Sequence, residues 1–232
     1  MATATKLASP QLATTLAMAF ADDPVFGYLL PDSETRPLVL SVYFATKLIE
    51  ARANDWPVVV PFAAGASTGK LDAASVAMWE PPVGQPPAGQ AGGGGAGAVD
   101  RLPDTDTVTD GADIRKMLFK AHGGEGIERR LHAMREMTGR RPSTPHWYLS
   151  LLGTAPASRG RGLASRVIEH VTAECDRTGV GAYLESSNLA NVAMYRRHGF
   201  EVIATHQLPD GPPVPLMWRK SQGGRRATIG KL

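Results

Sequence analysis

The sequence predicts an α/β (α+β) fold in which short buried strands alternate with amphipathic helices. Apolar or β-branched runs of strand length lie at 56–62, 75–79, 147–155, 180–186, 201–207 and 214–219. Apolar residues recur at helical spacing in 10–20, 36–52, 114–121, 127–137, 163–178 and 188–199. The length of 232 residues suits one domain, or one domain with an insertion.

The stretch from Trp147 to Val171 organises the chain. An apolar run between Pro145 and Pro156 favours a buried strand, and the residues after Gly162 favour a helix. The apolar face of this helix comprises Leu163, Ala164, Val167, Ile168, Val171 and Cys175. Between strand and helix lies a turn with two glycines and two arginines. The first turn of a helix has unpaired backbone N–H groups beside the positive end of the helix dipole, an arrangement that can hold a phosphate or diphosphate.

Two other interpretations of this turn remain open. Glycine and arginine together also occur in solvated loops and in RNA-binding Arg-Gly segments. The turn lacks the Gly-x-x-x-x-Gly-Lys-Ser/Thr pattern of a P-loop and the Gly-x-Gly-x-x-Gly pattern of a Rossmann turn. Arg161 followed by Gly162 is compatible with a diphosphate held by main-chain donors with guanidinium charge beside them.

Composition narrows the classes of partner. The chain is 43% hydrophobic and 20% charged, which is ordinary for a globular protein. Its net charge of +3 is small, and part of it lies at Arg225, Arg226 and Lys231, so nucleic-acid binding is not favoured. The single cysteine, Cys175, lies on an apolar helix face and is expected to be a buried, inert thiol. No run of about 18 apolar residues and no secretory signal is present, so we expect a cytoplasmic protein without a membrane partner.

The predicted domain runs over 1–220. Residues 84–110 are dominated by Gly, Pro, Ala, Asp and Thr, a composition that predicts a flexible insertion, and 221–232 are expected to be a disordered basic tail. In 22–31, prolines and a glycine interrupt any long helix. The aromatic residues there are expected either in the core or in the wall of a substrate cleft. His122 and His132 lack ligand partners at metal-binding spacing, so we expect no metal.

A second motif follows the next strand. The turn reads Arg159-x-x-Gly162-x-Ala164, the strand carries Glu185, and the helix reads Asn191-x-x-x-Tyr195-x-x-x-Gly199-Phe200. Together these motifs resemble the GCN5-related N-acetyltransferase (GNAT) superfamily, whose turn is Gln/Arg-x-x-Gly-x-Gly/Ala. The resemblance covers about 145–220, and Ala164 stands where many members have glycine. Within the superfamily this half is most similar to puromycin N-acetyltransferase and related drug- or toxin-modifying members, through Leu184-Glu185-Ser186 and the turn at 209–212.

The resemblance implies a mixed, mostly antiparallel sheet whose fourth and fifth strands splay apart around acetyl-CoA. It implies that backbone groups of Leu152, Gly153 and Thr154 contact the pantetheine arm. It also implies that Arg159, Gly160, Arg161, Gly162, Leu163, Ala164 and Ser165 surround the diphosphate, with Asn191 hydrogen-bonded to the cofactor and Tyr195 near the thioester sulfur.

The chemistry of acyl transfer supports these roles. Acetyl-CoA is an activated co-substrate, so alignment of an amine against the thioester supplies several kcal/mol. A main-chain N–H near Leu152 can stabilise the developing oxyanion. A tyrosine with a pKa of ~10 can protonate the leaving thiolate, because the parent thiol has a pKa of ~8.5. This favours Tyr195 as the general acid. Glu185 is the candidate base for the amine, and His146 is a lower-ranked one; an ion-paired strand residue is the competing interpretation of Glu185.

The leading hypothesis is acetylation of a primary amine on a small molecule such as an antibiotic, toxin or metabolite. The alternative is a protein or peptide N-acetyltransferase, which would need an open groove. Phe20, Phe26 and Tyr28 could line the enclosed pocket that a small molecule requires. A non-enzymatic CoA- or RNA-binding module is the third possibility, but basic residues do not alternate with aromatic ones along the chain.

Overall fold

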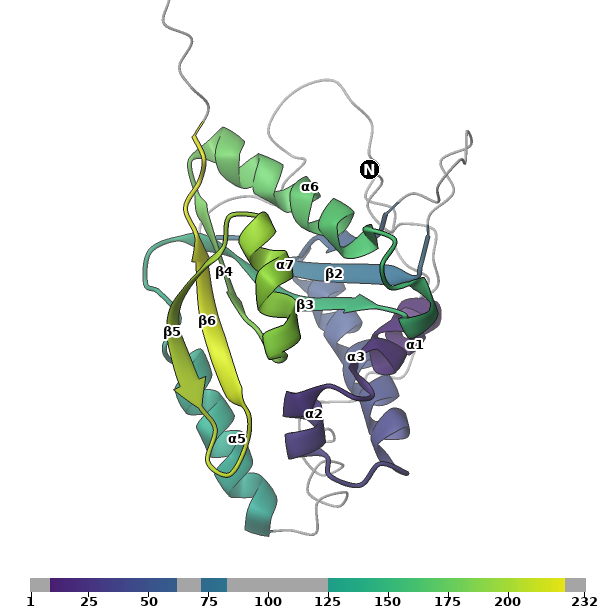
Figure 1. Cartoon of the computed structure of the whole chain (residues 1–232). Coiled ribbons are helices and arrows are strands. Elements are labelled where there is room, and N and C mark those ends of the chain that lie inside the picture. The colour runs from purple at the N-terminus through teal and green to yellow at the C-terminus, as the bar shows by residue number, and fades with distance from the viewer. Residues whose placement is uncertain (1–8, 62–71, 83–124, 224–232) are drawn as a thin grey trace, which may run out of the picture.

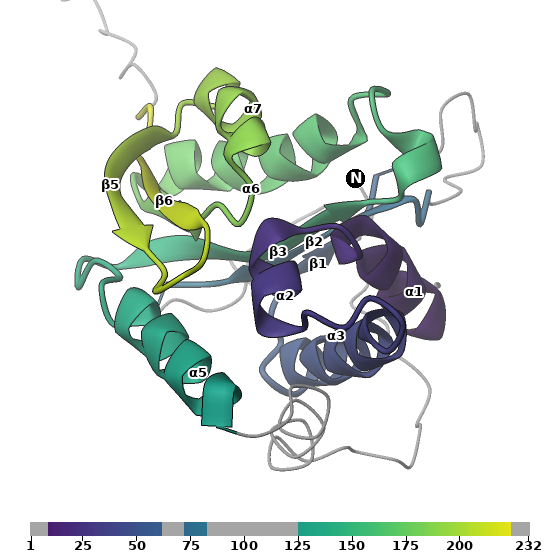
Figure 2. The same cartoon turned by 60° about the horizontal axis from the view of Figure 1, so that its bottom comes forward.

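The computed structural model describes residues 9–61, 72–82 and 125–223. One central sheet separates two helical layers (Figures 1 and 2). Helices α6 (Leu163–Thr178) and α7 (Val192–Arg197) cover one face, and α1 (Ser9–Phe20), α3 (Arg36–Ala53) and α5 (Glu125–Thr138) lie on the other. Buried apolar side chains form a core on each face of the sheet. The sequence therefore folds as the predicted mixture of helices and strands.

The sheet has six strands in the order β1-β2-β3-β4-β6-β5. Their bounds are Val58–Val59 (β1), Ser75–Glu80 (β2), His146–Thr154 (β3), Gly181–Glu185 (β4), Glu201–Gln207 (β5) and Pro213–Arg219 (β6). All neighbouring pairs are antiparallel except β3 and β4, which are parallel. This confirms the mixed, mostly antiparallel sheet. The β3–β4 ladder joins 146–148 to 181–183, and β3 then continues as far as Thr154.

Three elements differ from the sequence-based expectation. The strand expected over 56–62 is a two-residue strand, Val58–Val59. The helix expected over 188–199 is a 3₁₀ turn, Leu189–Asn191, followed by α7. The interrupted segment 22–31 contains a short helix, α2 (Pro24–Leu29), because Asp23 caps its N-terminus and proline occupies its first position.

Gly153, near the end of β3, lets α1 pack closely against this strand. A Cβ atom at this position would lie 2.9 Å from the Cβ of Ala19 and 2.9 Å from Cδ2 of Leu16. Real Cβ contacts are longer, so only glycine allows this spacing. The close approach places the end of α1 beside the end of β3.

The predicted helix at 114–121 and the predicted insertion at 84–110 fall outside the described residues, as does the tail beyond residue 223. Within the described ranges, none of the helices combines the length and the hydropathy that a membrane span requires.

Candidate active site

Helix α6 begins from a glycine turn without a side-chain cap. Gly162 adopts a left-handed conformation with φ of 72°, and no side chain hydrogen-bonds at this N-cap. The Gly162 carbonyl accepts from the Arg166 N–H over 3.2 Å, which starts the helical ladder. The N–H groups of the preceding turn have no acceptor within the helix. The local sequence thus produces a helix N-terminus that can receive an anion through its backbone.

A cavity of about 530 Å³, here called the turn cavity, lies against this helix start. It brings together all but one of the residues predicted to hold the cofactor. Its lining includes Leu152, Gly153, Thr154, Arg159, Gly160, Gly162, Leu163, Ala164, Ser165 and Asn191. Arg161 is the exception: it does not line the cavity, and its guanidinium lies 3.4 Å from the Ser158 hydroxyl and 3.8 Å from the Asp72 carboxylate.

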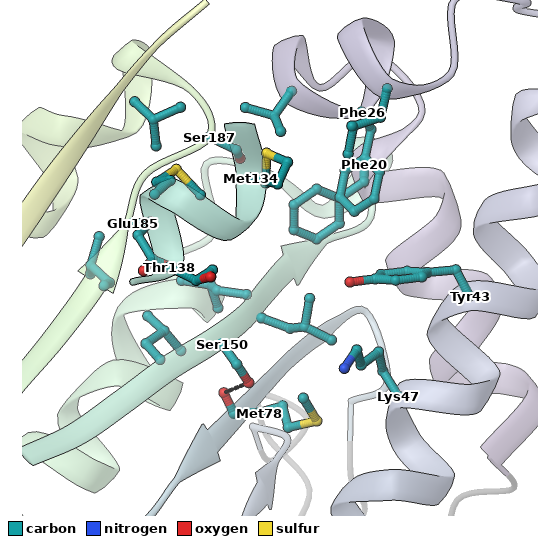
Figure 3. Close-up of a pocket in the computed structure, with 18 of the residues that line it drawn as sticks. Phe20, Phe26, Tyr43, Lys47, Met78, Met134, Thr138, Ser150, Glu185 and Ser187 are labelled. Carbon is teal, nitrogen blue, oxygen red and sulfur yellow. Dashed lines mark hydrogen bonds between the residues drawn. The ribbon is translucent and has the colours of Figure 1, made fainter. Parts of the chain in front are cut away.

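A second cavity of about 360 Å³, here called the inner cavity, lies between the sheet and helices α2, α3 and α5. Phe20, Phe26 and Tyr43 form an aromatic wall, and Met134 contributes from α5 (Figure 3). Tyr28, the third aromatic residue considered for this role, is buried and does not line either cavity. The inner cavity therefore offers mainly apolar surface to a ligand.

The two cavities meet at one place. Phe20, Leu152, Asn191 and Tyr195 line both of them. Tyr195 lies on α7 and is 7% exposed. Burial, followed by the negative charge of Asp23, raises its pKa above the ordinary value. The phenol consequently keeps its proton at neutral pH and can donate it at the junction of the two cavities.

Glu185 lies at the end of β4 and lines the inner cavity. Its carboxylate accepts a hydrogen bond of 2.6 Å from the Tyr148 hydroxyl and one of 3.3 Å from Arg141 Nε. The Arg141 guanidinium also stacks over the Tyr148 ring, 3.6 Å from its centroid. Each carboxylate oxygen has a further lone pair, so Glu185 can still accept from a ligand or a water molecule.

Two further charged residues line the inner cavity. Glu80 lines it and lies 3.8 Å from an Arg141 nitrogen. Burial raises the pKa of Glu80 above its usual value. Lys47 also lines the cavity and pairs with Glu50 over 2.6 Å. The inner cavity thus combines a mainly apolar lining with a few charged groups.

His146 lines neither cavity. Its ring packs edge-on against Tyr183 and Trp218 at the start of β3, which places it away from the junction. Cys175 is fully buried, and burial raises the pKa of its thiol to about 12, so it is the inert thiol that was predicted. The described residues contain no group of three or more candidate metal ligands.

Sequence reasoning missed Asp23, Ser187, Arg141 and Tyr148 as site residues. Asp23 had a local signal, since an aspartate before proline marks a helix start. That signal indicates a cap and not a site. Tyr148 and Arg141 gave no signal, because their contact with Glu185 depends on which strands become neighbours in the sheet.

Two comparisons relate part of the chain to known acetyltransferases. Residues 127–200 match the family described as the acetyltransferase (GNAT) family. An uncharacterised N-acetyltransferase of Schizosaccharomyces pombe is 39% identical over 71 residues, which are 30% of this chain and 29% of that protein. The matched segment thus spans under a third of that curated relative.

A crystal structure described as histone acetyltransferase HPA2 and related acetyltransferase, from Corynebacterium glutamicum, shares the fold over nearly the whole length. The TM-score is 0.61 with 22% identity, covering 96% of each chain. The matched segment contains the end of β3, the turn, the start of α6 and α7, which line most of the turn cavity, whereas the end of α1, which also lines it, lies outside the segment. Residues 127–200 thus match the acetyltransferase (GNAT) family in sequence, and nearly the whole chain shares its fold with an acetyltransferase structure.

Proposed function

We propose that this enzyme transfers an acetyl group from acetyl-CoA to the primary amine of a small molecule. The observation that supports this most directly is the junction of two cavities at Tyr195. One cavity lies against an uncapped helix N-terminus, and the other is mainly apolar. A two-substrate transfer needs such an arrangement, because each substrate requires its own site and the reacting ends must meet.

The residues of the turn cavity fit acetyl-CoA. The diphosphate would lie on the backbone N–H groups between Arg159 and Ser165, where the helix dipole and the guanidinium of Arg159 favour negative charge. Space is open beside Gly160 and Gly162, since a Cβ at either position would meet nothing within 4 Å. Leu152, Gly153 and Thr154 continue from this turn toward Tyr195 and would contact the pantetheine arm.

Acetyl-CoA supplies an activated thioester when it is bound. Tyr195 would protonate the leaving sulfur, and its raised pKa keeps that proton available. Asn191 lines both cavities and would hydrogen-bond the cofactor near the same point. In this sheet the two strands predicted to splay apart around the cofactor correspond to β3 and β4. Their parallel ladder ends at Tyr148, and the splay would open beyond that residue.

Glu185 remains the candidate base for the incoming amine. Its carboxylate lines the inner cavity, and Arg141 and Tyr148 hold it in a fixed orientation. An amine enters mostly as an ammonium ion at neutral pH, so it must lose a proton before it can attack. Glu185 would take that proton, directly or through one water molecule.

The volume and the mainly apolar lining of the inner cavity favour a small acceptor with an apolar body over a peptide. A volume of about 360 Å³ is within the range of small-molecule pockets. The likeness to puromycin N-acetyltransferase and other drug-modifying enzymes remains a prediction, and so does the identity of the acceptor. A protein or peptide substrate is the alternative that the following experiment tests.

Two measurements test the proposal. Calorimetry should show one acetyl-CoA bound per chain, and absence of binding at high protein concentration would refute the core of the proposal. Thiol release from acetyl-CoA should then be followed with 2-phenylethylamine, hexylamine, spermidine and a lysine-containing peptide. Higher kcat/KM for the apolar amines supports a small apolar acceptor, whereas preference for the peptide supports the alternative.

A further inference from the structure

Asp23 and Ser187 form a hydrogen-bonded pair that has no part in the function described so far. Ser187 Oγ donates to Asp23 Oδ2 over 2.5 Å, although the two residues are 164 positions apart in sequence. Ser187 lines the inner cavity, Asp23 lines the turn cavity, and Tyr195 lines both (Figure 3 shows Ser187 in the inner cavity). The pair therefore connects the two cavities near the residue at which they meet.

The local structure fixes the orientation of Asp23. As the N-cap of α2, its Oδ1 atom accepts from the backbone N–H groups of Val25 at 2.9 Å and Phe26 at 3.1 Å. This leaves Oδ2 for Ser187. The side chain is 8% exposed, and burial raises the pKa of Asp23 even though the hydrogen bonds from Ser187 and α2 oppose the shift. A carboxylate with a raised pKa is a better proton acceptor near neutral pH than an ordinary aspartate.

The proposed acetyl transfer has two protons to remove from the acceptor. An ammonium ion that becomes an amide loses one proton before attack and a second one as nitrogen bonds to the acetyl carbon. Glu185 is the proposed acceptor of the first proton, which passes on to solvent. The leaving thiolate takes a proton from Tyr195, so this phenol must be protonated again before the next turnover.

We propose that Ser187 takes the second proton from the amine nitrogen and passes its own hydroxyl proton to Asp23 Oδ2. Ser187 is then a catalytic residue, and Asp23 is the proton acceptor behind it. The nitrogen–carbon bond forms, the carbon–sulfur bond breaks, and the thiol leaves with the proton from Tyr195. The proton held by Asp23 then replaces the one that Tyr195 gave up. All three side chains end in their starting protonation states.

The position of Asp23 supports the last step. Asp23 and Tyr195 line the same turn cavity, and the negative charge of Asp23 contributes to the raised pKa of that phenol. A phenolate beside Asp23 therefore attracts the proton strongly. This inference rests on the proposed acetyltransferase function, and it assigns the second proton of the reaction to a specific pair of side chains.

A purely structural role for the pair is the competing explanation, since the hydrogen bond also fastens α2 to the loop after β4. Asp23→Asn separates the two roles, because an asparagine oxygen can still cap α2 but the amide cannot take a proton. Ser187→Ala removes the relay and Ser187→Thr keeps a hydroxyl.

Asp32→Asn is a matched control. Asp32 Oδ1 accepts from the Glu34 N–H at 2.9 Å and its Oδ2 accepts from the Thr35 hydroxyl at 2.7 Å, yet Asp32 is exposed and lines neither cavity. Its conversion to asparagine therefore repeats the chemical change at Asp23 at a site without a role in transfer.

The first measurement needs no substrate. Carbon-13 NMR titration of the carboxyl groups in the free protein should show Asp23 titrating above 3.8, its ordinary value. Ser187→Ala should raise this pKa further, because the lost hydrogen bond stabilised the charged form. An Asp23 titration that does not move in Ser187→Ala overturns the pairing on which the relay depends.

The second measurement is thiol release with 2-phenylethylamine, or with hexylamine if the wild type prefers it. Asp23→Asn and Ser187→Ala should each lower kcat by about 10²-fold, the usual scale of a lost acid–base group. The double variant should be no slower than the slower single one, because the residues act as a unit. Ser187→Thr should recover most of the rate. The dissociation constant for acetyl-CoA and the Tm should stay close to those of Asp32→Asn.

Several outcomes would overturn the relay alone: wild-type kcat in either variant, additive losses in the double variant, or Ser187→Thr as slow as Ser187→Ala. A lower kcat accompanied by a lower Tm or by weaker acetyl-CoA binding would show that Asp23 and Ser187 have a structural role and no part in proton transfer. A wild-type protein that neither binds acetyl-CoA nor releases thiol with any amine refutes the proposed function itself, and the relay with it.

Discussion

The Tyr148 hydroxyl donates a hydrogen bond of 2.6 Å to Glu185 Oε2, from one parallel strand to its neighbour. Burial, followed by the negative charge of Glu185, raises the pKa of Tyr148 well above its ordinary value, so the phenol remains a donor at neutral pH. The Glu185 carboxylate consequently has a fixed position in the inner cavity.

This relationship predicts different effects for the two residues. Glu185→Gln should lower kcat/KM by about 10²-fold, because an amide cannot take a proton from the amine. Tyr148→Phe should lower it by less than about 10-fold, since the carboxylate stays and only its orientation loosens. Thiol release from acetyl-CoA measures both. Equal losses in the two variants would contradict the role of Glu185 as the base.

Tyr195→Phe should lower kcat by about 10²-fold or more and leave acetyl-CoA affinity unchanged. The raised pKa of Tyr195 also sets the pH dependence. The acid form is the active one, so loss of its proton should not reduce kcat below pH 10, the ordinary value for tyrosine. A pH–rate profile and calorimetry test both statements. Unchanged turnover in Tyr195→Phe would exclude the phenol as the general acid.

Arg159 and Arg161 form a natural comparison. Arg159 lines the turn cavity and donates to the Ala19 carbonyl over 3.0 Å, whereas Arg161 does not line that cavity. Arg159→Gln should weaken acetyl-CoA binding by about 10-fold, the worth of one charge-assisted contact, and more at low salt. Arg161→Gln should have a smaller effect. Calorimetry at two ionic strengths compares them, and the reverse order would place the diphosphate elsewhere.

Gly153→Ala should destabilise the fold. Its Cβ would lie 2.9 Å from side-chain atoms of Leu16 and Ala19, and overpacking of this kind costs about 1–3 kcal/mol. Gly139→Ala is the control, because its Cβ would meet its nearest neighbour at 3.4 Å. Urea unfolding gives the free energy of unfolding for both variants. A Gly153→Ala protein as stable as Gly139→Ala would show that α1 can move away from β3.

Asp176 should support stability in a pH-dependent way. Its two carboxylate oxygens each accept a 2.8 Å hydrogen bond from Arg219, and this pairing lowers the pKa of Asp176 below 3.8. A lowered folded-state pKa gives stability that is present above the unfolded-state value and lost as pH falls through the folded one.

Asp176→Asn should therefore cost about 1.5–3 kcal/mol at pH 7, the range for hydrogen bonds to charged groups. The difference from wild type should shrink as the pH falls below 3.8. Thermal unfolding across this pH range measures it. A difference that stays constant down to pH 2 would assign the effect to packing instead of to charge.

The sequence alone determined the local elements, including the turn and the helix start that line the turn cavity. The turn at Gly162, the helix after it and the placement of Tyr195 before Gly199 depend on residues within a few positions of one another. Helical periodicity, capping and left-handed glycines are properties of such short segments, so they can be recognised before folding. The residues of the turn line the turn cavity as expected, except for Arg161.

Only the tertiary structure decided the inner cavity. The inner cavity exists because α2, α3 and α5 lie on the same face of the sheet, and the contact between Asp23 and Ser187 joins the first elements of the chain to the loop after β4. Strand length and helix periodicity do not specify which elements become neighbours. That choice comes from burying the apolar faces of all elements together, and no short segment contains the information that decides it.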